Sequence, residues 1–151
     1  RHIAAVLLVE AGSQVGLPCC KGGNLLHLAA ASGHAKIMDM LLSKGLDINT
    51  RDRKGRTPLY RAVVYGASQR RGAQYLLETI LQLGGDPNIA NCVGWTPLHK
   101  AAKMGDETAV DTLLRWSARS DIYDSTKHTA MDIAIEFGHL GVVEKLVAYG
   151  V

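Results

Sequence analysis

No apolar run in this 151-residue chain is long enough to cross a bilayer. A membrane-spanning helix needs about 18 consecutive apolar residues. The opening stretch IAAVLLV is short and is followed at once by Glu10 and Gly12, which argues against a secretory signal peptide. We therefore expect no membrane insertion.

Cysteine and aromatic residues are also scarce. The three cysteines are Cys19, Cys20 and Cys92, and neither their odd number nor their spacing suggests a disulfide framework or a zinc site. Reduced thiols indicate a cytoplasmic or nuclear protein. Aromatic residues make up 5% of the chain. The abundant alanine, leucine and glycine favour helices that end at glycines over a β-sandwich.

One sequence pattern recurs four times along the chain. It reads GGNLLHLAAASG, GRTPLYRAVVYG, GWTPLHKAAKMG and KHTAMDIAIEFG, beginning at Gly22, Gly55, Gly94 and Lys127. Intervals of 33, 39 and 33 residues separate the helix-cap positions, which are Asn24, Thr57, Thr96 and Thr129. A period of this length indicates an array of stacked helical units.

Each unit is expected to hold two helices. Threonine is a good N-cap, and Pro58 and Pro97 suit the first helical position, where a missing N–H costs nothing. The first helix is predicted to stop at a glycine, which is Gly33, Gly66, Gly105 or Gly138 in the four units. Apolar pairs four residues apart, such as Leu113 and Leu114 after Ala109 and Val110, then predict a second helix.

The segments TPLH, AAKMGD, LHLAAASGH and GLDIN resemble ankyrin repeats, and the resemblance covers the entire chain. It implies an all-α solenoid of stacked helix-turn-helix units with β-hairpin fingers at the joints. Lys127 departs from the pattern because it replaces the finger glycine, at a position where we expect a positive φ.

We divide the chain into one repeat domain, residues 1–151, with a partial repeat at 1–18. Full repeats then follow at 19–51, 52–90, 91–123 and 124–151. The second repeat has six extra residues, which we place at 67–72 in the link between its helices. Neither end has a polar capping repeat and the first residue is not Met. We therefore expect the domain to be monomeric and part of a longer protein.

The residues that suggest catalysis fall on repeat positions. His27 and His99 occupy one such position, and the resemblance implies that this histidine forms hydrogen bonds within and between units. No nucleophile, paired base or phosphate-binding glycine motif accompanies them. We predict no catalytic residue, no metal, no cofactor and no enzyme activity.

The resemblance implies a protein-binding module that uses its finger tips and the concave face of the first helices. Exposed aromatic and arginine residues near the middle of such a face are typical of binding hot spots. The alternative is that some of these side chains only stabilise the stacking of repeats. The predicted partner-binding residues are Arg53, Lys54, Arg56, Tyr65, Val93, Trp95, Lys100, Lys103, Met104, His128 and Phe137.

The charge is uneven although the net charge is only +3, which does not by itself indicate nucleic acid. Residues 51–71 hold seven basic residues against one acidic residue, Asp52, whereas residues 104–151 hold eight acidic and four basic residues. The basic stretch is either solvated surface or a docking patch for an acidic segment of a partner.

Two further readings stay open. The array could sense a small anionic nucleotide-like ligand, with Trp95, Tyr65 and Phe137 stacking on rings while Arg56, Lys100 and Lys103 meet phosphates. It could also be the targeting domain of a larger enzyme, channel or ubiquitin-ligase adaptor.

A possible modification follows from the resemblance. Asn49 and Asn88 match the turn asparagine that asparaginyl hydroxylases modify in ankyrin repeats. The alternative is that both are unmodified turn residues.

Overall fold

The computed structural model describes residues 25–68 and 72–150. The predicted partial repeat at 1–18, Cys19, Cys20 and the cap residue Asn24 lie outside this part. The described residues form eight helices: α2 (Leu25–Ala31), α3 (Ala35–Ser43), α4 (Pro58–Ser68), α5 (Ala73–Gln82), α6 (Pro97–Met104), α7 (Glu107–Arg115), α8 (Ala130–Glu136) and α9 (Leu140–Ala148).

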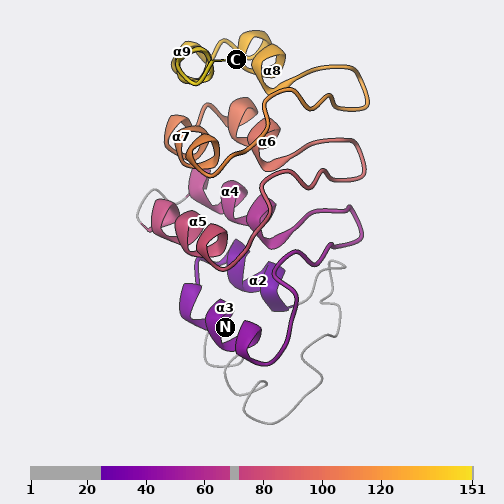
Figure 1. Cartoon of the computed structure of the whole chain (residues 1–151), viewed down its shortest axis with the longest axis vertical. Coiled ribbons are helices and arrows are strands. Elements are labelled where there is room, and N and C mark those ends of the chain that lie inside the picture. The colour runs from indigo at the N-terminus through magenta and orange to yellow at the C-terminus, as the bar shows by residue number, and fades with distance from the viewer. Residues whose placement is uncertain (1–24, 69–71, 151) are drawn as a thin grey trace.

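The helices stack in two layers. One layer contains α2, α4, α6 and α8, each in contact with the next, and the other contains α3, α5, α7 and α9 (Figure 1). Loops project from one side of the stack as a row of fingers (Figure 1). This arrangement confirms the predicted all-α repeat solenoid. No helix within the described ranges is long and apolar enough to cross a membrane.

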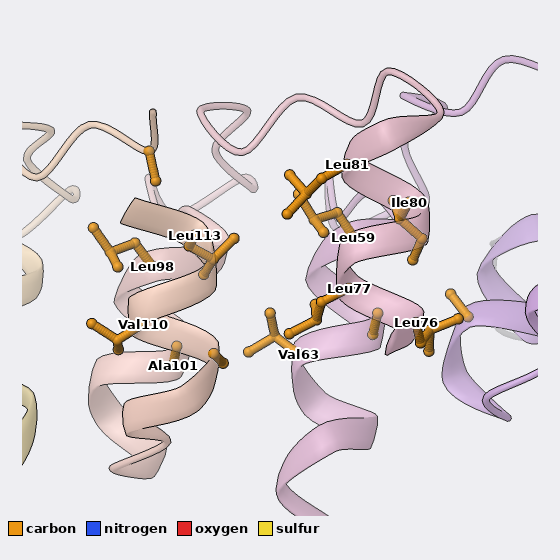
Figure 2. Packing of buried hydrophobic residues seen from close by; sticks show 14 of the residues in the cluster. Leu59, Val63, Leu76, Leu77, Ile80, Leu81, Leu98, Ala101, Val110 and Leu113 are labelled. Carbon is orange, nitrogen blue, oxygen red and sulfur yellow. The ribbon is translucent and has the colours of Figure 1, made fainter. Parts of the chain in front are cut away.

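The core runs continuously between neighbouring repeats. Leu59, Leu76, Leu98 and Leu113 are almost fully buried (Figure 2). Burying such a side chain contributes about 1.5–3 kcal/mol relative to leaving it exposed. No helix pair could cover its apolar face alone, so the fold depends on contacts between successive units.

Hydrogen bonds at the helix starts match the expected caps. The side chain of Thr96 accepts a hydrogen bond from the backbone N–H of His99, and Thr129 accepts one from Asp132. Thr57 caps α4 through the N–H of Tyr60 at 3.3 Å. Local sequence therefore fixes where the first helix begins in the last three units.

The helix ends follow the prediction at three of four glycines. Gly33, Gly105 and Gly138 have φ between 67° and 75°, in the left-handed region. The prediction for Gly66 was wrong, because α4 continues through it to Ser68. Part of the predicted insert at 67–72 therefore lengthens α4 instead of forming a loop. Gly72, with φ 80°, then precedes α5.

The finger glycine position also behaves as predicted. Lys127 has φ 66°, close to the φ 72° of Gly55. Within the described residues the fingers are turns with no assigned strand, so the expected β-hairpins are reduced to short closed loops.

Candidate functional site

An aspartate or asparagine closes each described finger. In the first of them the carboxylate Oδ1 of Asp52 accepts hydrogen bonds from the backbone N–H groups of Lys54 and Arg56, both at 2.9 Å. Asn91 and Asp124 make the same pair of bonds in the next two fingers. Each tip is therefore held by its own side chain.

Neighbouring fingers are joined by one backbone hydrogen bond each. Cys92 N–H donates to the carbonyl of Lys54 at 2.9 Å, and Ser125 N–H donates to the carbonyl of Val93 at 3.0 Å. The side chains of Arg53, Lys54 and Val93 remain exposed at the tips, as expected for predicted partner-binding residues. The exposed thiol of Cys92 lies beside them.

The repeated histidines connect successive repeats. His27 Nε2 lies 2.7 Å from the carbonyl oxygen of Arg56, and His99 Nε2 lies 3.3 Å from that of His128. Burial lowers the pKa of both imidazoles below the ordinary 6.5. A neutral ring can donate one N–H to the carbonyl. These contacts confirm the structural role that the repeat resemblance implies.

Three side chains on the finger side of α6 and α8 form what we call the aromatic clamp: Trp95, Lys103 and Phe137. The ammonium nitrogen of Lys103 lies 5.4 Å from the ring centroid of Trp95 and 5.1 Å from that of Phe137. Trp95 also stacks on His99, with centroids 6.4 Å apart. The cation is thus held between two rings of its own chain.

The indole of Trp95 is further bound to the next finger. Its Nε1–H donates to Oδ2 of Asp124 at 2.9 Å. Hydrogen bonds from His128 N–H, Thr126 and this indole outweigh burial and hold the pKa of Asp124 at about 2, so the carboxylate is charged. Trp95 is therefore a half-buried link between repeats and not the freely exposed tip residue expected from the sequence.

Two more predicted binding residues also have internal partners. Tyr65 is half-buried, and a Cβ atom added at Gly33 would lie 2.5 Å from its ring. Arg56 forms a salt bridge of 2.8 Å with the buried Asp52. Because these rings and cations already contact the protein, the geometry disfavours the nucleotide-like ligand that would need Tyr65, Trp95 and Arg56 free.

Two other cations have no such partner. Arg61 of α4 and Lys100 of α6, which we call the cationic pair, occupy the same repeat position in successive helices and are half-buried. Neither takes part in any salt bridge within the described ranges, and the buried Nε–H of Arg61 has no hydrogen-bond partner there. Burial, then the charges of Lys103 and Arg56, lower the pKa of Lys100.

Arg61 was not named as a single partner-binding residue, although it belongs to the basic stretch that was predicted as a possible docking patch. Arg61 stands four residues after Thr57 as the predicted binding residue Lys100 stands four after Thr96, so the repeat register could have paired them. Arg70 and Arg71, which belong to the same basic stretch, lie outside the described residues.

Apolar side chains border the cationic pair on one side. Leu28 of α2 is 47% exposed and Val64 of α4 is 36% exposed. On the other side, Glu136 of α8 is exposed and Phe137 is 46% exposed. We call the surface of α2, α4, α6 and α8 that carries these residues the inner face. Along the stack the exposed or half-buried side chains of the inner face are first apolar, then basic, and finally the acidic Glu136 beside the apolar Phe137.

A hollow of about 520 Å³ lies at the C-terminal ends of α4 and α6, away from the fingers that precede these helices. Gly66, Ala73, Met104 and Glu107 are among its lining residues, so it lies where α4 and α6 end and α5 and α7 begin. The predicted binding residue Met104 is half-buried there and does not join the cationic pair. His128 is exposed beside the clamp, with Nδ1 2.8 Å from Oγ1 of Thr126.

The two candidate asparagines make matching bonds. The amide of Asn49 donates to the carbonyl of Gly84 at 3.1 Å and accepts from Asp86 N–H at 2.8 Å. The amide of Asn88 donates to Ser117 and accepts from Arg119 in the same way. Both side chains connect turns of successive repeats, and their hydroxylation stays a prediction.

Metal ligands do not gather in the described part of the chain. It contains no group of three or more histidine, cysteine, aspartate or glutamate side chains that could hold an ion. The chemistry that the inner face offers is therefore hydrogen bonding, charge and apolar contact.

Comparison with known proteins identifies the repeat. The family described as "Ankyrin repeats (3 copies)" matches residues 2–81 and 67–151. The human protein named ankyrin repeat and SOCS box protein 16 is 33% identical over 87% of this chain and 30% of its own length. The human channel named transient receptor potential cation channel subfamily A member 1 is 28% identical over 97% of this chain and 13% of its own. The mouse cyclin-dependent kinase 4 inhibitor B is 33% identical over 82% of this chain and 90% of its own.

Proposed function

Because the chain belongs to the ankyrin repeat family, we propose that it is a non-catalytic module that binds a partner protein through its inner face and finger tips. Ankyrin repeats are protein-interaction modules. The observation that carries the proposal is the row of side chains on the inner face that the core does not need. Leu28, Val64 and Phe137 expose apolar surface there, next to uncompensated positive charge at Arg61 and Lys100.

The relatives support binding as the role of such an array. The mouse relative, 90% of which aligns with this chain, is named as an inhibitor of a kinase. A stack of this size therefore makes up most of a protein whose name states an action on another protein.

The longer relatives support a related role for the whole protein. This chain spans only 30% of the SOCS box protein and 13% of the channel. We propose that in such a longer protein the array docks the rest of the chain onto its partner. This arrangement is compatible with the cytoplasmic or nuclear location expected from the reduced thiols.

Site-directed photo-crosslinking tests the proposed surface. A photoreactive amino acid is placed at Val64 on the inner face or, as control, at Asp39, which is exposed on α3 in the outer layer. We expect crosslinked partner proteins from the Val64 position and few or none from Asp39. Crosslinking to the same proteins at Asp39 but not at Val64 would assign binding to the outer layer.

A further inference from the structure

The cationic pair has chemistry that the fold itself does not use. The Arg and Lys side chains that form salt bridges in the described part are others: Arg56 pairs with Asp52, Arg115 with Glu78 and Asp111, Arg119 with Asp121, and Lys145 with Asp111. Arg61 and Lys100 have none, although both are half-buried. Burial and then the charges of Lys103 and Arg56 lower the pKa of the half-buried Lys100, so its positive charge is unfavourable in the free protein and a bound anion would reduce that cost.

Acids of the neighbouring fingers already have partners. Asp52 is buried and bound to Arg56 and to two backbone N–H groups. Asp124 is bound to Trp95, Thr126 and His128. No salt bridge joins a described acid to Arg61 or Lys100, so we look for their anion outside the described residues.

We propose that the cationic pair binds carboxylates of an acidic segment in the partner protein, with apolar side chains of the same segment lying over Leu28 and Val64. This inference rests on the proposed function and adds the chemistry and direction of the partner. Arg61 and Lys100 supply several N–H donors, and a guanidinium matches a carboxylate in a bidentate geometry.

The order of apolar, basic and acidic side chains along the inner face predicts which end of the bound partner segment lies over the first repeat. Leu28 and Val64 contribute apolar surface in the first two described repeats, and the cationic pair follows in the second and third. The exposed Glu136 in the last repeat repels further acids. Helices in contact lie about 8–10 Å apart, and an extended chain covers about 3.3 Å per residue. A matching segment therefore carries acids about three residues apart, with apolar residues on the side toward the first repeat.

Nucleotide phosphate fits this surface less well than carboxylate. A nucleotide would need an unoccupied ring beside the cations. In the aromatic clamp Lys103 already lies between Trp95 and Phe137, and the ring of Tyr65 lies against Gly33. A peptide needs no stacking partner, and the exposed Leu28 and Val64 offer it apolar contact instead.

The test uses a peptide array and this chain as it stands. The peptides are about twelve residues long and place two leucines and two glutamates in all arrangements on a glycine-serine background. A twin of each peptide carries glutamine in place of glutamate. We expect binding to favour peptides with leucines at one end and glutamates about three residues apart, and to fall at least about tenfold for the glutamine twins. Raising the salt concentration should weaken it further.

Charge reversal supplies the matched controls. The variant with Arg61→Glu and Lys100→Glu should lose the glutamate peptides. The variant with Lys36→Glu and Lys44→Glu changes the formal net charge equally at exposed positions on and next to α3, and should keep them. If the first variant does not fold, as judged by circular dichroism, Arg61→Gln with Lys100→Gln replaces it, with the same expected loss.

Each result decides the inference. Equal binding of glutamate peptides and their glutamine twins would overturn it, as would binding retained after charge reversal. Selective binding of phosphopeptides or nucleotides without glutamate peptides would overturn it too, and so would an array on which nothing binds. In all these cases the proposed function is judged separately, because crosslinking from Val64 does not depend on the partner's charge.

Discussion

Two groups of side chains on this side of the stack differ in what they contact. In the aromatic clamp, Trp95, Lys103 and Phe137 bind one another, and Trp95 also bonds to Asp124 of the next finger. In the cationic pair, Arg61 and Lys100 form no salt bridge within the described residues. Residues that the repeat pattern leaves free therefore divide into those that stabilise the stack and those available to a partner.

This difference has a consequence for mutagenesis. Replacing Trp95 and Tyr65 together by alanine would remove two supports of the stack, so a loss of partner binding would not identify a binding surface. Substitutions at Arg61 and Lys100 disturb no hydrogen bond or ion pair of the described fold. The following predictions test the comparison from the largest expected effect to the smallest.

Trp95→Ala should have the largest effect on stability. It removes a half-buried aromatic ring, its hydrogen bond to the charged Asp124, and the contacts to Lys103 and His99. We expect the free energy of unfolding to fall by about 3 kcal/mol, measured by urea titration. Trp95→Phe keeps the ring and should lose about half as much. A Trp95→Ala protein as stable as the wild type would show that the clamp does not support the stack.

Gly33→Ala should come next, because the new Cβ would lie 2.5 Å from the ring of Tyr65 at a residue with φ 75°. Gly138→Ala is the matched control, since φ is 73° there and no atom lies within 4 Å of the added carbon. The control should cost about 1 kcal/mol for backbone strain, and Gly33→Ala about 1–3 kcal/mol more for the clash. Equal thermal shifts for both variants would mean that Tyr65 moves aside freely.

Acidification should weaken the scaffold. Burial lowers the pKa of His27 and His99 below 6.5 in the folded state, so the unfolded chain takes up protons first as the pH falls. Their contribution to stability is complete above pH 6.5 and is lost as the pH falls through their folded pKa values. We expect a lower free energy of unfolding at pH 5.5 than at pH 7.5, and imidazole NMR signals that titrate below 6.5. His99→Gln should reduce the difference; a stability independent of pH in this range would contradict the assignment.

Lys103→Met should have a small effect, because it removes a cation held between two rings but keeps an apolar side chain there. A loss of about 0.5–1 kcal/mol is expected from calorimetry. Arg61→Met, in the cationic pair, should change stability less or even raise it, because it removes a buried donor without a partner. A larger loss at Arg61 than at Lys103 would reverse the comparison.

Much of the fold could be predicted from local sequence because caps and turns act within a few residues. The cap at Thr96 and the positive φ of Lys127 depend on their own short segments, and both were predicted correctly. Gly66 was wrong because a glycine can remain helical when the chain continues in register. No residue near Gly66 in the sequence indicates that α4 ends only at Ser68.

The division of the inner face could not be predicted because it depends on contacts between repeats. The partner of Trp95 lies 29 residues further along the chain, at Asp124. Lys103 is held because Phe137 of the next unit, 34 residues further along the chain, lies against it. An exposed aromatic residue and a bound one look alike in sequence until the stacking geometry brings such distant residues together.

The hydrogen bonds that Asn49 and Asn88 make to the next repeat require an amide side chain at both positions after the protein has folded. At Asn49 and Asn88 one side chain both donates to and accepts from the next turn, which an amide can do and a carboxylate cannot. Slow deamidation to aspartate would place a negative oxygen against the carbonyl of Gly84 or Ser117 and turn attraction into repulsion. The cohesion between repeats thus depends on two amide nitrogens that ageing of the protein could remove.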